Sequence, residues 1–155
     1  MGRFAVPKSD TSKLMSEVIQ YSITLASAGY RDVKGYIEEN LPSIEVLEGP
    51  YGGEDCEMYA LGTNRMMNRL GVVYPDTETP EEGSYVFFSD RSGRYNHVAR
   101  LAGKGIIEQK VSVHGPVVRG PIELIPEEYG PFYSFKNIPD EDLRFWKRDS
   151  GITGD

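Results

Sequence analysis

Hydrophobic residues in the first part of the chain recur at three- and four-residue intervals, which is the period of an amphipathic helix. The residues on this apolar face are Leu14, Val18, Tyr21, Leu25 and Ala28. Asp10 to Ser12 offer capping side chains before the face, and Gly29 follows it. This arrangement predicts a first helix between these signals.

The same spacing predicts a second helix from Arg31 to Leu41, ending before Pro42. Its expected buried residues are Val33, Ile37 and Leu41, and Gly35 stands in its interior.

A third helical pattern begins at Cys56, directly after the glycine-rich segment GPYGGEDC. Its face comprises Cys56, Tyr59, Ala60, Thr63, Met67 and Leu70. Asp55 is a suitable N-cap residue and Gly71 a suitable C-terminal cap, so one continuous helix is predicted here.

Beyond Asp76 the pattern changes to short apolar runs separated by the turn sequences PDTETPEEG, SDRSGR and AGKG. The runs 84–88, 97–102 and 105–113 predict strands of an antiparallel meander. After them we expect an extended strand with an ordered loop, a short helix from Pro139 to Lys147 and a frayed tail. The aromatic residues from Tyr129 to Phe135 are expected in the core or in a groove wall. Trp146 is expected to dock the last helix.

Together these elements predict an α+β fold in which N-terminal helices pack on a small antiparallel sheet. The length of 155 residues and the 39% hydrophobic content fit a single domain over 1–155. We divide it into a helical part at 1–48, a core at 49–125 and a C-terminal extension at 126–155.

The composition argues against several classes of partner and site. The formal net charge is −7 and no basic run exceeds Lys147-Arg148, which argues against nucleic acid as a partner. The single cysteine excludes an intramolecular disulfide and a multi-cysteine zinc site. No apolar stretch approaches a membrane span and the start has no secretory leader, so we expect synthesis in the cytoplasm and no membrane partner.

Cys56 is the candidate nucleophile, because a helix start lowers the pKa of a thiol and so favours the reactive thiolate. The alternative is a small apolar residue in the first turn. His97 heads a predicted strand on the same face as Ala99 and is the candidate base.

Gln109 is a polar exception on the apolar face of Ile107, Val111 and Val113. An odd-numbered loop in the AGKG hairpin places Gln109 directly opposite His97, and an even-numbered loop places Lys110 there. Gln109 is therefore the candidate that orients the imidazole, with Glu108 and His114 as alternatives.

The segments YGGEDC, GSYVFFSD, NHVARLAGKG and IIEQ occur in an order that resembles the NlpC/P60 family of papain-like cysteine peptidases. The resemblance covers about half of the chain, from Gly49 to Ile125. Departures are Glu57-Met58, where the family usually has Ser-Gly, and Ser84-Tyr85 in place of Asp-Leu. The linker between the cysteine helix and the aromatic strand is also short.

This resemblance implies a papain-like core with Cys56 as nucleophile, His97 as base and Gln109 as orienting residue. Tyr51 and Asp55 are the substrate-side candidates. The implied activity is that of a cysteine hydrolase that cleaves amide bonds in stem peptides of bacterial peptidoglycan by acyl transfer, without metal or cofactor.

Three further hypotheses stay open on the sequence alone. The same fold could serve as a non-catalytic structural or interaction module, or as an amidase or acyltransferase on another amide. The absent leader suggests delivery to the cell wall as a phage component or through a secretion machine, which would then be a partner. A cytoplasmic peptide-recycling enzyme is the alternative.

Overall fold

The computed structural model describes residues 3–6, 10–24, 30–48, 56–63, 65–111, 115–126 and 128–149. Its centre is a seven-stranded sheet in the order β1-β7-β3-β4-β5-β6-β2, and every neighbouring pair is antiparallel. The strands are β1 (Arg3–Ala5), β2 (Glu45–Glu48), β3 (Tyr85–Ser89), β4 (Tyr95–Gly103), β5 (Ile106–Lys110), β6 (Val117–Pro121) and β7 (Phe132–Lys136).

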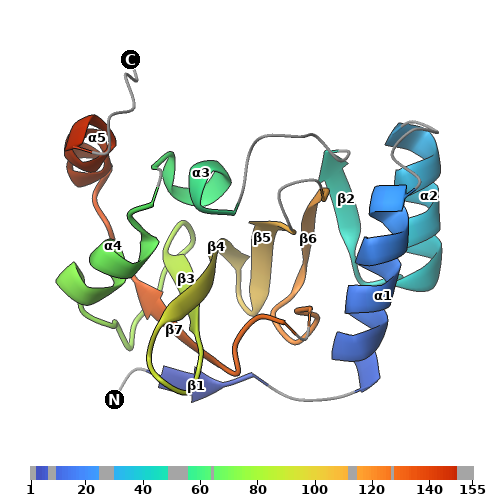
Figure 1. Ribbon diagram of the computed structural model, residues 1–155, viewed down its shortest axis with the longest axis horizontal. Coiled ribbons are helices and arrows are strands. Elements are labelled where there is room, and N and C mark those ends of the chain that lie inside the picture. Colours follow the sequence, from blue (N-terminus) through green and yellow to red (C-terminus); the bar gives the residue numbers. More distant parts are fainter. Residues whose placement is uncertain are drawn as a thin grey trace.

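Five helices accompany the sheet among the described residues (Figure 1). They are α1 (Asp10–Thr24), α2 (Tyr30–Asn40), α3 (Cys56–Leu61), α4 (Met67–Val73) and α5 (Asp140–Asp149). The α+β class is therefore as expected. The order of elements is not helices first and strands second, because β1 and β2 precede α3 and α5 ends the described chain.

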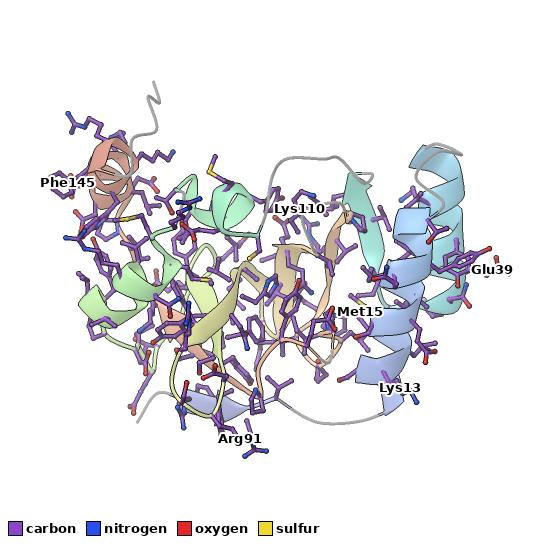
Figure 2. All side chains as sticks on the ribbon, viewed as in Figure 1. Lys13, Met15, Glu39, Arg91, Lys110 and Phe145 are labelled. Carbon is purple, nitrogen blue, oxygen red and sulfur yellow. The ribbon has the colours of Figure 1, made fainter. Side chains whose placement is uncertain are left out.

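Helices α1 and α2 lie side by side at the β2 end of the sheet (Figure 1). Their buried side chains form one cluster with residues of β2, β6 and the end of β5. Its members are Met15, Val18, Ile19, Val33, Ile37, Leu41, Ile44, Val46, Val111 and Val118. Figure 2 shows Met15 on the side of α1 that faces the sheet and Glu39 on the outer side of α2.

The predicted apolar face of the first helix is partly wrong. Val18 is buried as expected, but Leu14 and Tyr21 are exposed by 39% and 51%, while Met15 and Ile19 are buried. The buried stripe is therefore shifted around the helix, and the Tyr21 ring packs on Tyr36 of α2 at the surface. The second helix buries Val33, Ile37 and Leu41 as predicted.

The two faces of the central strands carry different clusters. On one face, Tyr85, Phe87 and Val98 pack with residues of α3, α4 and α5, and Trp146 docks there as expected. On the other face lie Val86, Phe88, Ala99, Leu101, Ile107, Ile122 and Ile125. This separation follows from the alternation of side chains along a strand.

The predicted helix from Cys56 to Leu70 is wrong, because the segment forms two helices, α3 and α4. Between them Gly62 and Arg65 adopt left-handed backbone angles, with φ of 68° and 61°. Gly71 is not a cap but an interior residue of α4. An added Cβ at Gly71 would lie 2.1 Å from the ring of Tyr95, so glycine permits the close approach of α4 to β4.

No helix within the described residues is both long and apolar enough to cross a membrane.

The contact between Gly71 and Tyr95 is testable with a pair of glycine substitutions. We expect Gly71→Ala to lower the free energy of unfolding by about 1–3 kcal/mol, because the methyl group overlaps the Tyr95 ring. The matched control is Gly35→Ala in α2, where nothing lies within 4 Å of the added Cβ. The control should gain about 0.5–1 kcal/mol from helix propensity. Urea unfolding measures both, and a stabilised Gly71→Ala would contradict the packing.

Candidate active site

His97 lies on β4 and is completely buried, at 0% exposure. Its backbone partner on β3 is Phe88, whose ring centroid lies 5.4 Å from that of the imidazole. The ring of Tyr129 stacks on the imidazole at 3.8 Å between centroids and an interplanar angle of 7°. His97 therefore sits inside the protein, enclosed by aromatic side chains.

Gln109 on β5 forms a hydrogen bond with His97, at 2.8 Å between Oε1 and Nε2. The register pairs Glu108 with Arg100 and Ile107 with Leu101, so Gln109 is level with Ala99 and not directly opposite His97. Neither predicted register is correct, because the hairpin contains an irregularity between Leu101 and Gly103. The two side chains nevertheless share a face, and the bond runs diagonally across the strands.

The bond to Gln109 determines the protonation of the imidazole. An amide oxygen only accepts hydrogen bonds, so Nε2 carries the proton and Nδ1 carries the lone pair. Nδ1 is buried and has no hydrogen-bond partner. Burial lowers the pKa of His97 to about 4, although the bond to Gln109 opposes this shift. The ring is therefore neutral near pH 7, with one nitrogen available to accept a proton.

Cys56 is the first residue of α3, and its side chain is half-buried. It packs against the cluster that contains Ala60, Leu61 and Val98, on the face of β4 opposite to His97. The structure thus brings His97 and Gln109 together and leaves Cys56 on the α3 side of the sheet. Nδ1 of His97 makes no hydrogen bond to the sulfur. With six residues, α3 also supplies a shorter helix behind the thiol than the sequence predicts.

Glu57 has a structural role at the position where a serine would follow the cysteine in the family. Its carboxylate is buried, at 7% exposure, and accepts hydrogen bonds from the Thr63 hydroxyl at 3.1 Å and the Met66 backbone N–H at 2.6 Å. These bonds satisfy donors of the turn between α3 and α4. The long helix predicted from Cys56 is therefore interrupted after Leu61 by a turn that Glu57 stabilises.

Glu108, an alternative orienting residue, points away from His97. It lies on the other face of β5 and forms an ion pair with Arg119 of β6.

The next residue on that face of β5 is Lys110, which is 1% exposed and donates a hydrogen bond from Nζ to the Gly115 carbonyl at 2.8 Å. Figure 2 shows Lys110 between α3 and β2.

Tyr51, Asp55 and His114 lie outside the described residues, so their predicted roles stay predictions. Among the described residues, no group of three or more His, Cys, Asp or Glu side chains is arranged to hold a metal ion.

Tyr129 was not predicted as a site residue, although its ring has the closest stacking contact recorded for His97. The sequence indicated only that aromatic residues near it belong to the core or to a groove wall. Its position depends on the return of the chain from β6 to β7, and no spacing pattern indicates that return.

Comparison of the chain with models of known families, with curated proteins and with solved structures gives no match. The resemblance to NlpC/P60 peptidases therefore depends on the order of the motifs in the sequence.

The buried neutral His97 predicts a specific pH dependence of stability. The pKa is about 4 in the folded protein and about 6.5 when unfolded. Between these values the unfolded chain binds the proton and the folded protein does not. The contribution of the neutral imidazole to the free energy of unfolding is therefore fully present above pH 6.5 and is lost as the pH falls toward 4. The loss approaches about 3 kcal/mol.

Urea unfolding of wild type and His97→Phe between pH 7 and pH 4 measures this contribution of His97 to the free energy of unfolding. Carboxylate titrations are common to both proteins, so the wild type should lose more stability over this range than the variant. Parallel curves would contradict a neutral buried imidazole.

Proposed function

We propose that the protein is a cysteine hydrolase in which Cys56 is the nucleophile, His97 the general base and Gln109 the residue that orients the imidazole. The observation that carries the proposal is the buried Nδ1 of His97, which has a lone pair and no partner. An unpaired buried polar atom costs stability, and such atoms call for an explanation such as a catalytic role.

The hydrogen bond between Gln109 and His97 supports the same assignment. It fixes the tautomer whose free nitrogen accepts a proton, as the third member of a catalytic triad does. In the proposed reaction Nδ1 takes the proton of the Cys56 thiol, and the thiolate attacks an amide carbonyl. His97 then gives the proton to the leaving amine, and water hydrolyses the thioester.

The proposed substrates are amide bonds in the stem peptides of bacterial cell walls, as the resemblance to NlpC/P60 peptidases implies. Phage- or secretion-mediated delivery to the wall belongs to the same proposal. The reaction requires Cys56 Sγ to come within hydrogen-bond distance of Nδ1, a contact that the described geometry does not include. Because Cys56 packs against the cluster on the other face of β4, this contact requires a rearrangement at the start of α3 and not only the tightening of an existing hydrogen bond.

A second candidate function is a structural or interaction module without catalysis. Two observations favour it: His97 is 0% exposed, and Cys56 packs against the cluster on the opposite face of β4. In this case the bond to Gln109 satisfies a buried imidazole and the thiol is part of the core.

The rate of alkylation of Cys56 by iodoacetamide distinguishes the two functions. An activated thiolate should react at least about tenfold faster than a free thiol of pKa near 8.5 at neutral pH, because more of it is ionised. His97→Gln should slow the reaction to the rate of an ordinary thiol. Cys56 is the only cysteine, so the protein needs no further labelling control. An ordinary rate that His97→Gln leaves unchanged would favour the non-catalytic module.

Digestion of purified cell-wall fragments tests the substrate. Wild type should release peptide products that mass spectrometry identifies, and Cys56→Ala should release none. Glu57→Gln is the matched control, because it changes the neighbouring residue and keeps an acceptor for Thr63 and Met66. Equal products from wild type and Cys56→Ala would exclude Cys56 as nucleophile.

A further inference from the structure

The stack of Tyr129 on His97 is the closest ring contact recorded for either residue. An interplanar angle of 7° means that the phenol covers the imidazole face to face. The other described contacts of the imidazole are Phe88 and the bond to Gln109. None of these groups is charged at neutral pH, and no charged group contributes to the pKa of His97.

Tyr129 is held in place by the residues on both sides of it. Gly130 exchanges two hydrogen bonds with Asn96, the neighbour of His97: the Asn96 amide donates to the Gly130 carbonyl at 2.9 Å, and the Gly130 N–H donates to Asn96 Oδ1 at 3.2 Å. Glu128 accepts a hydrogen bond from Ser16 of α1 at 2.8 Å. The short segment is thus anchored to β4 at one end and to α1 at the other.

The two contacts of the imidazole restrict different motions. The bond from Nε2 to Gln109 fixes one atom of the ring, but the ring can still tilt about that atom. A parallel stack at 3.8 Å resists this tilt and excludes water from that side of the ring. Together the two contacts restrict the direction in which the Nδ1 lone pair points.

We propose that Tyr129 is a positioning residue for His97. Its ring keeps the imidazole in the orientation that forms the hydrogen bond with Gln109, and it shields the imidazole from water. The role in catalysis rests on the proposed function, whereas the effect on the imidazole does not. The proposal gives the segment after β6 a role in orienting His97, the proposed general base.

The test is an NMR titration of the histidine side chains in wild type, Tyr129→Phe and Tyr129→Ala. The chain has two histidines, and His114→Gln identifies the signal of His97. In wild type and Tyr129→Phe, His97 should stay neutral until about pH 4, because both keep the stacked ring. In Tyr129→Ala water reaches the imidazole, so the midpoint should rise by at least about one pH unit toward 6.5.

An unchanged midpoint in Tyr129→Ala would overturn the proposal, and so would a Tyr129→Phe variant that behaves like Tyr129→Ala. Where Tyr129→Ala does not fold, Ser16→Ala loosens the Glu128 anchor and leaves the ring intact. This variant should raise the midpoint by a smaller amount, and no rise would count against the proposal.

Kinetics on cell-wall fragments connect the titration to the reaction. Tyr129→Ala should lower kcat on the order of tenfold or more with little change in KM, because a displaced base acts on the transition state. Tyr129→Phe should retain the wild-type kcat. If the wild type shows no hydrolysis, the proposed function fails, while the titration still decides whether Tyr129 positions the imidazole.

Discussion

The centre of the sheet is arranged around an imidazole that has to stay uncharged. His97 has no access to water, and its hydrogen-bond partner is the neutral amide of Gln109. A carboxylate in place of this amide would stabilise the protonated ring and raise its pKa. The stacked Tyr129 and the nearby Phe88 add no charge. Burial therefore favours the neutral form that can accept a proton, and it outweighs the hydrogen bond to Gln109, which raises the pKa of the ring.

The periodicity of the sequence predicts the elements whose ends are marked by turn sequences or by a proline. β3, β4 and β5 are found where turn sequences separate apolar runs, and α2 and α5 are found where a proline marks one end of each. The three- and four-residue strands β1 and β2 are too short to show alternation, and both lie at the edges of the sheet. The break between α3 and α4 lies where Gly62 and Arg65 adopt left-handed backbone angles and Glu57 binds the turn, and a helical pattern of apolar residues does not indicate it.

The part of the candidate site that the sequence predicts is the one where a polar residue interrupts the apolar face of a strand. Gln109 is a polar residue on an apolar face, and its bond to His97 explains why it is there. The partner that stacks on the ring was not predictable, because Tyr129 belongs to an irregular segment that approaches from outside the β4–β5 hairpin. The placement of Cys56 relative to His97 also depends on tertiary packing, since α3 rests on the face of β4 that carries Val98.

The bonds of Glu57 have a mechanical consequence for the thiol beside it. Glu57 ties the start of α3 to Met66, and Asn68 in the first turn of α4 accepts a hydrogen bond from the Tyr95 N–H at 2.8 Å. Tyr95 begins the strand that carries His97. A short chain of covalent and hydrogen bonds therefore couples the backbone of Cys56 to that of His97 through α4. The placement of the thiol relative to the imidazole therefore depends on this linkage as well as on α3.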